Sequence, residues 1–149
     1  MRKINVKKIF GVIILGFVVL NLSWFSITTI KYKKYIKDIP KIKNSSYGIK
    51  KEDGYNYHVK KPDYLQYTGN LAVDNYEKGK LLIIWPLIFG GYEYGFRIQE
   101  EGGAYEIYVD ENMNPIDKED KIAIEKFQEH KTELEEMLIK ANEMWQLEE

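Results

Sequence analysis

The chain of 149 residues contains no cysteine, which excludes disulfide bonds, thiolate metal sites and cysteine nucleophiles. A small domain without disulfide bonds must be stabilised by its apolar core. Tyrosine, phenylalanine and tryptophan together make up 14% of the residues, and each buried ring removes a large area from water. The composition therefore favours a small domain with an aromatic core.

Serine and histidine are also scarce, which limits the catalytic chemistry of the chain. All four serines lie within the first 46 residues, so the later residues cannot form a Ser–His–Asp arrangement. The two histidines, His58 and His130, show no metal-ligand spacing such as H-E-x-x-H. We expect His58 to be exposed and His130 to be half-buried on the apolar face of a helix. The sequence therefore predicts no catalytic residue, no metal site and no cofactor.

Two other patterns resemble functional sites without meeting their requirements. The segment after Asp110 opens like a calcium loop, but Pro115 replaces the required glycine and Lys121 replaces the required glutamate. The acidic pairs at residues 100–101 and 135–136 fall in an expected turn and on an expected polar helix face. They indicate solvated surface, so an enzyme based on two carboxylates is the least favoured reading.

Charge is divided unequally along the chain, although the net charge is only −1. Residues 1–43 carry ten basic residues and one acid, Asp38, whereas residues 44–149 carry twelve basic and twenty-two acidic residues. Such an asymmetry indicates two environments. The acidic part should repel nucleic acid, because nucleic-acid binding depends on neutralising phosphates. We therefore expect no nucleic-acid partner.

The longest uncharged stretch covers the 22 residues 9–30. As a helix it would rise about 33 Å, which is enough to cross a hydrocarbon core of about 30 Å. The sequence predicts a basic tail at residues 1–8 and a transmembrane anchor at residues 9–30 that binds the lipid bilayer, in a single-pass cell-membrane protein of bacterial type. Aromatic residues that favour a membrane interface lie near the second end of the stretch: Trp24, Phe25, Tyr32 and Tyr35.

Two alternatives exist for this stretch. In a cleaved signal peptide, residues 9–20 would be the apolar region, but residues 21–26 lack well-placed small residues for a cleavage site. A buried helix of a soluble protein rarely runs this long without a polar stripe. Basic residues flank both ends, so the positive-inside rule does not decide the orientation. The resemblance of the start to a secretory leader favours a domain outside the cytoplasm.

The rest of the chain divides into a linker and one domain. Residues 31–46 are basic and polar and contain Pro40, a composition typical of a juxtamembrane stalk. Residues 47–149 form an acidic domain in which apolar and polar residues alternate, the pattern of half-buried strands. We expect such strands at residues 55–59, 65–73, 92–98 and 105–109.

A further strand is expected in the uninterrupted apolar run at residues 81–89. The run is too short to span a bilayer, so we expect a central strand buried on both faces. Pro86 should mark a bulge or the end of pairing there, because proline cannot donate to a sheet. Gly69 should mark a bulge or a close approach of another segment.

The C-terminal part shows the period of a helix. Asp117 is the expected N-cap, and residues 117–146 predict one long helix. Its apolar face recurs at steps of three and four residues: Ala123, Phe127, His130, Leu134, Met137, Leu138, Ala141 and Trp145. The predicted fold is α+β, with an N-terminal transmembrane helix followed by a four- or five-stranded antiparallel meander that packs against one long C-terminal helix.

Four residues are the predicted partner-binding residues. A helix over residues 117–146 would be about 45 Å long and would extend past strands of about 30 Å, leaving Met144 and Trp145 uncovered. Most of the twelve tyrosines fall on the strand rows that face the helix. Tyr64 and Tyr108 do not, so they are candidates for an exposed aromatic surface.

These observations favour a non-catalytic interaction or accessory domain that binds an envelope protein. The alternative is a module that binds cell wall or another glycan through exposed tyrosines, since aromatic rings stack on sugars and pack well against protein partners.

Overall fold

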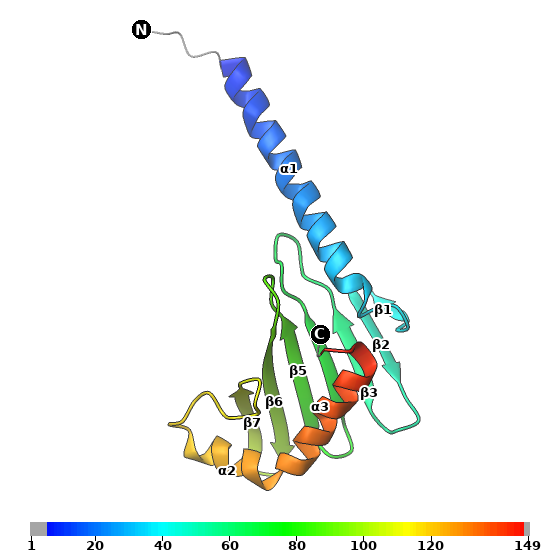
Figure 1. The fold of residues 1–149 in the computed structure, drawn as a ribbon, viewed down its shortest axis with the longest axis vertical. Helices are drawn as coiled ribbons and strands as arrows, with labels where there is room; N and C mark the ends of the chain where they lie inside the picture. The colour runs from blue at the N-terminus through cyan, green and yellow to red at the C-terminus, as the bar shows by residue number, and fades with distance from the viewer. Residues whose placement is uncertain (1–5, 148–149) are drawn as a thin grey trace.

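The computed structural model describes residues 6–147, in which a long helix leads into a sheet covered on one face by two helices (Figure 1). The first five residues of the predicted basic tail lie outside the described residues. The elements are α1 (Val6–Lys33), β1 (Lys41–Lys43), β2 (Ser46–Lys50), β3 (Asn56–Lys60), β4 (Asn70–Asn75), β5 (Lys80–Pro86), β6 (Tyr92–Glu100), β7 (Gly103–Val109), α2 (Lys121–Glu129) and α3 (Lys131–Trp145).

The sheet is an antiparallel meander in which every strand pairs with the next, in the order β1-β2-β3-β4-β5-β6-β7. The α+β class and the meander are as predicted, but the number of strands is seven and not four or five. The two additional strands, β1 and β2, form one edge of the sheet. Their sequences, KIK and SYGIK, contain only one and two large apolar residues, so their alternation is too short to indicate a strand.

The strand expected at residues 65–73 is shorter than predicted, because β4 begins only at Asn70. Leu65 has a φ of 60° and is exposed, so it belongs to a loop over residues 61–69. The predicted close approach at Gly69 is confirmed. A Cβ atom at this position would lie 2.0 Å from the backbone oxygen of Lys60, so only glycine fits there.

The strand expected at residues 81–89 ends at Pro86, where Tyr92 is the last pairing partner. Pro86 therefore marks the end of pairing, as predicted. The expectation that both faces of this strand are buried is wrong. Buried and half-buried residues alternate along β5, because helices cover only one face of the sheet.

The C-terminal helix is divided at His130, so the prediction of one continuous helix over residues 117–146 is wrong. The N-cap of α2 is Asp120 and not Asp117: its carboxylate accepts a hydrogen bond of 2.9 Å from the backbone N–H of Ala123. The division lets α2 pack against β7 while α3 crosses β4 and β5 (Figure 1). Both helices thus stay on the sheet, and a straight helix would extend past it.

The core lies between the sheet and these helices. Apolar side chains of alternate strand positions meet Phe127, Leu134, Met137 and Ala141 of α2 and α3. The strand residues of the core are Tyr57, Val59, Leu71, Val73, Leu82, Ile84, Phe96, Ile98, Ile107 and Val109. Most are large or β-branched, so they fill the space between the layers.

Residues 31–46, which the sequence predicts as a stalk, are packed into this domain. Tyr32, Tyr35 and Ile39 are buried at 0%, 3% and 5% exposure and belong to the core. The segment after them supplies β1. The domain therefore begins within the last turns of α1, and no free spacer separates it from the helix.

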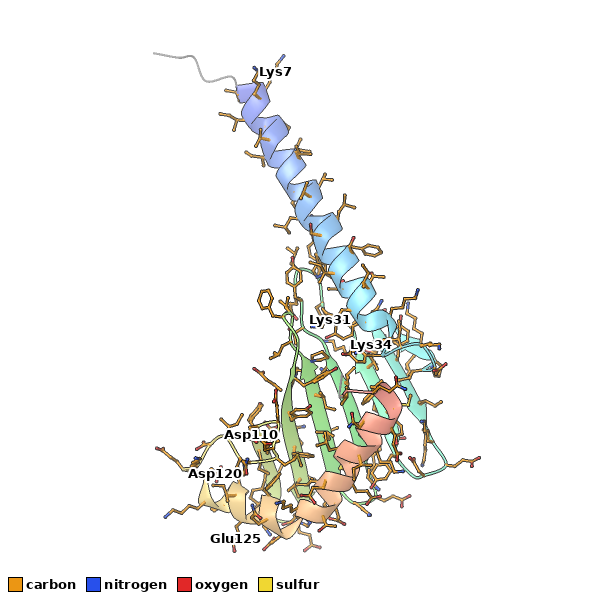
Figure 2. The ribbon with its side chains drawn as sticks, in the orientation of Figure 1. Lys7, Lys31, Lys34, Asp110, Asp120 and Glu125 are labelled. Carbon is orange, nitrogen blue, oxygen red and sulfur yellow. The ribbon has the colours of Figure 1, made fainter. Side chains whose placement is uncertain are left out.

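The helix α1 projects away from the sheet and is long and apolar enough to cross a membrane, the one such helix among the described residues. Its apolar side chains up to Leu20 are exposed. Figure 2 shows Lys7 at the far end of α1 and Lys31 and Lys34 at its junction with the sheet. The lysines therefore bracket the exposed apolar stretch at both ends, the arrangement expected of a membrane helix.

Candidate functional site

The face of the sheet opposite α2 and α3 carries no helix among the described residues, and it holds the most exposed aromatic pair of the strands. Trp85 of β5 and Tyr108 of β7 stack with their ring centroids 5.8 Å apart and an interplanar angle of 24°. Tyr108 is 53% exposed. Aromatic groups that are presented this way supply a large contact area for a ligand.

Gly95 of β6 makes this stack possible. It pairs with Ile83 on one side and with Tyr108 on the other, so it lies directly beneath the rings. A Cβ atom at this position would lie 3.0 Å from two ring carbons of Trp85 and 3.5 Å from Cδ1 of Tyr108. Any side chain here would push the tryptophan away from the sheet.

An ion pair borders the aromatic stack. Arg97 Nε donates a hydrogen bond of 2.9 Å to Glu106 Oε1, and the two side chains are 50% and 52% exposed. Between this pair and the stack lies a shallow hollow of about 210 Å³. We call the surface formed by Ile83, Trp85, Gly95, Arg97, Glu106 and Tyr108 the open-face site.

The open-face site combines aromatic rings with two opposite charges. An exposed ion pair contributes little stability, since water screens it, so its charges remain available to a ligand. Stacked rings beside a guanidinium and a carboxylate can hold a flat apolar group and orient its polar edge. The side chains of the site include no serine, threonine, lysine or histidine.

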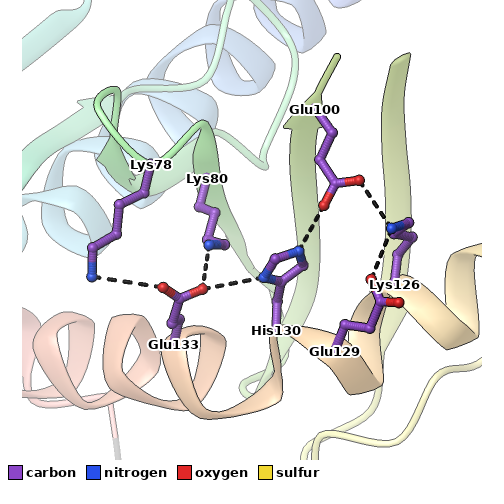
Figure 3. Close-up of polar contacts among 7 residues, drawn as sticks. All are labelled: Lys78, Lys80, Glu100, Lys126, Glu129, His130 and Glu133. Carbon is purple, nitrogen blue, oxygen red and sulfur yellow. Dashed lines mark hydrogen bonds and ion pairs between the residues drawn. The ribbon is translucent and has the colours of Figure 1, made fainter. Parts of the chain in front are cut away.

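The densest polar cluster of the described residues lies elsewhere, where α2 meets α3 (Figure 3). The His130 ring contacts two carboxylates: its Nε2 lies 2.8 Å from Glu100 Oε1, and its Nδ1 lies 3.2 Å from Glu133 Oε2. Glu133 also accepts a hydrogen bond from the buried ammonium group of Lys80. Lys78 Nζ approaches the other oxygen of Glu133 at 3.8 Å.

The carboxylates of this cluster are held in their charged form. The hydrogen bond from Lys80 is the main reason that the pKa of Glu133 lies below its usual value. The hydrogen bond with His130 is the main cause of the lowered pKa of Glu100. These interactions connect β5 and β6 to the start of α3, so they fix the bend between the two helices.

Glu100, Glu129 and His130 come close enough together to be considered as metal ligands. A lysine ammonium already occupies the place of a cation, because Lys126 Nζ lies 3.0 Å from Glu100 Oε2 and 2.8 Å from Glu129 Oε2. A metal would have to displace this charge. The cluster is therefore best explained as an ion-pair network that stabilises the fold.

His58 lies on the same sheet face as the open-face site. Its Nε2 lies 2.9 Å from Asp74 Oδ2 without the alignment of a hydrogen bond. Asp74 is nearly fully buried and accepts a hydrogen bond of 2.7 Å from Asn56. The His58 side chain is 38% exposed, so it is less open to water than the sequence predicts.

The predicted partner-binding residues do not come together. Tyr108 lies in the open-face site, whereas the exposed Tyr64 lies beside α1, with its ring centroid 5.3 Å from that of Trp24. Trp145 is only 4% exposed, and its Nε1 donates a hydrogen bond of 3.2 Å to the backbone oxygen of Tyr35. Met144 is half-buried against the core. The uncovered surface that a continuous helix would leave at Trp145 is thus absent, because the residues before β1 cover this side chain.

Sequence reasoning missed Trp85 and Gly95. The signal was present, because Ile83 and Trp85 alternate with Leu82 and Ile84 and therefore share one face. The uninterrupted apolar run concealed it by suggesting burial on both faces.

Comparison of the chain with protein-family models, curated protein sequences and solved structures finds no significant match.

Proposed function

We propose that the chain is a single-pass, membrane-anchored interaction module without catalysis, which binds a partner in the cell envelope through the open-face site. The observation that supports this proposal best is the Trp85–Tyr108 stack over Gly95, beside the Arg97–Glu106 ion pair, in which Tyr108 is exposed and Trp85 is half-buried. Aromatic residues and arginine are the residue types that contribute most to binding at protein interfaces.

The proposed anchor is α1, whose length and apolar surface fit a membrane span. We propose that the domain lies outside the cytoplasm. Protease added to intact cells should then remove the domain and leave the anchor, and a domain that stays protected until the cells are lysed would contradict this orientation.

The binding test uses the full chain in nanodiscs and detergent-solubilised envelope proteins. The wild type should retain an envelope protein, and both Trp85→Ala and Tyr108→Ala should reduce its retention at least tenfold. Ile139→Ala is the control, because Ile139 is 58% exposed on α3, which covers the opposite face of the sheet. Equal retention by all four proteins would contradict the role of the open-face site.

A glycan is the second candidate ligand, and the exposure of the Tyr108 ring favours it. An exposed aromatic ring can stack on the apolar face of a sugar. Co-sedimentation of the chain with isolated cell wall, lost in Trp85→Ala and kept in Ile139→Ala, would select the glycan over a protein partner.

A further inference from the structure

Two loops of the domain lie alongside α1. The first is the loop over residues 61–69 between β3 and β4, and the second is the turn over residues 87–91 between β5 and β6. Figure 1 shows both loops rising from the end of the sheet beside the helix.

The first loop contacts the middle of α1. The Tyr64 hydroxyl donates to Asn21 Oδ1, and Trp24 Nε1 donates a hydrogen bond of 2.6 Å to the backbone oxygen of Gln66. The rings of Trp24 and Tyr64 meet edge to face. The domain therefore reaches Asn21, well inside the uncharged stretch that ends at Ile30.

The second loop contacts α1 nearer its end. Lys31 Nζ donates hydrogen bonds to the backbone oxygens of Pro86, at 2.8 Å, and Leu87. These contacts fix the turn against the helix, so both loops have a fixed position along the axis of α1.

This arrangement limits how deeply α1 can enter a bilayer. The rise from Asn21 to Ile30 is about 14 Å. If the hydrocarbon began at Ile30, the irregular backbone of residues 61–69 would lie among acyl chains, where unpaired N–H and C=O groups are costly. If it began at Asn21, residues 9–20 would supply only about 18 Å of helix for a core of about 30 Å.

The tips of the two loops carry the apolar groups that would resolve this mismatch. Phe89 is 101% exposed, Ile88 is 45% exposed and Leu65 is 42% exposed. Tyr64 beside Leu65 is an aromatic residue of the kind that favours the headgroup region. Large apolar side chains gathered at one end of a domain indicate a binding surface.

A groove between α1 and the second loop has the same character. It measures about 600 Å³, and Ile27, Ile30 and Ile88 line it. Lys31 and Lys34 lie on it as well. Apolar walls beside lysines suit an acyl chain with an anionic headgroup, because such headgroups attract lysine.

We propose that the tips of residues 61–69 and 87–91 insert into the same membrane leaflet as the second half of α1, so that the domain is seated in the interface. The inference rests on the proposed membrane anchorage of α1. It deepens that proposal by assigning Leu65, Ile88 and Phe89 to the lipid contact and by fixing the sheet relative to the bilayer.

The absence of native cysteine permits a direct test in the full chain. Two variants, Phe89→Cys and Leu65→Cys, report on the loops. Phe17→Cys reports on the exposed surface of α1. Ile122→Cys reports on the exposed surface of α2, far from the loops. Each variant carries a nitroxide label and is reconstituted in vesicles of phosphatidylcholine and phosphatidylglycerol. Electron paramagnetic resonance then compares collisions with oxygen, which enriches in lipid, and with a water-soluble nickel chelate.

Labels at positions 17, 65 and 89 should favour oxygen, and the label at position 122 should favour nickel. If position 17 favours oxygen while positions 65 and 89 favour nickel as strongly as position 122, the anchor stands and the inference is overturned. If position 17 favours nickel as well, the anchorage itself fails and the inference fails with it.

Discussion

Tyr32, in the last turns of α1, accepts a hydrogen bond of 2.6 Å from the backbone N–H of Gly69 through its hydroxyl oxygen. The tyrosine is fully buried, so this bond joins the apolar helix to the start of β4 inside the core. The chain therefore connects α1 to the sheet twice: covalently after α1, and again through the hydrogen bond to Gly69, which lies 37 residues after Tyr32. A motion of α1 relative to the sheet would have to break this contact.

Tyr32→Phe should destabilise the domain, because it leaves the Gly69 N–H buried without a partner. The expected loss in the free energy of unfolding is about 1–3 kcal/mol. Urea unfolding of the full chain in detergent, followed by circular dichroism, measures it. Tyr76→Phe is the control, since Tyr76 is exposed, and an equal effect of both substitutions would contradict the role of the bond.

Gly69→Ala should be destabilising for a different reason. Its Cβ atom would overlap the backbone oxygen of Lys60, and a backbone group cannot rotate away as a side chain can. Forcing extra atoms into a packed region costs about 1–3 kcal/mol. Gly102→Ala is the matched control, because its Cβ atom would meet only the Tyr105 hydroxyl at an ordinary 3.8 Å. Unchanged urea midpoints for both variants would show that the loop shifts freely.

Trp145→Ala should cause the largest loss of stability. The side chain is buried against Tyr57, with ring centroids 6.0 Å apart, and is bonded to the backbone of Tyr35. Truncating a buried tryptophan costs about 3–5 kcal/mol. Ile139→Ala, at a position of α3 that is 58% exposed, should change the stability by no more than about 0.5 kcal/mol. Calorimetric melting temperatures of the two variants compare these losses. A change in melting temperature no larger for Trp145→Ala than for Ile139→Ala would contradict the contribution of Trp145 to the stability of the core.

Acid should weaken the connection between the sheet and α3. The pKa of Glu133 is lowered in the folded state, chiefly by the hydrogen bond from Lys80 and further by His130 and Lys78. A lowered folded-state pKa means that the stabilisation is present above the unfolded value of about 4.3 and is lost as the pH falls through the folded value.

Glu133→Gln should therefore lower the urea midpoint at neutral pH and reduce its dependence on pH below about pH 4.3. Glu125→Gln is the control, because the exposed Glu125 side chain lies on α2 outside the network. Identical slopes of midpoint against pH for the wild type and Glu133→Gln would contradict the assigned role of the carboxylate.

The apolar helix, the antiparallel meander and the helical structure after it could all be predicted from the amino-acid sequence. These features depend on local periodicity: an uncharged run for α1, alternation for β6 and β7, and steps of three and four residues for α2 and α3. The close approach at Gly69 and the end of pairing at Pro86 were also visible locally, because glycine and proline restrict the backbone in known ways.

Which of these surfaces face water depends on contacts between segments that are distant in the sequence. His130, where α2 and α3 divide, contacts Glu100, which lies thirty residues away, and Trp145 is covered by the segment that contains Tyr35. Burial of Tyr35 and the formation of β1 turn the expected stalk into part of the domain. The Trp85–Tyr108 stack needs Gly95 from the strand between them. Each outcome depends on contacts between distant segments, which local periodicity does not encode.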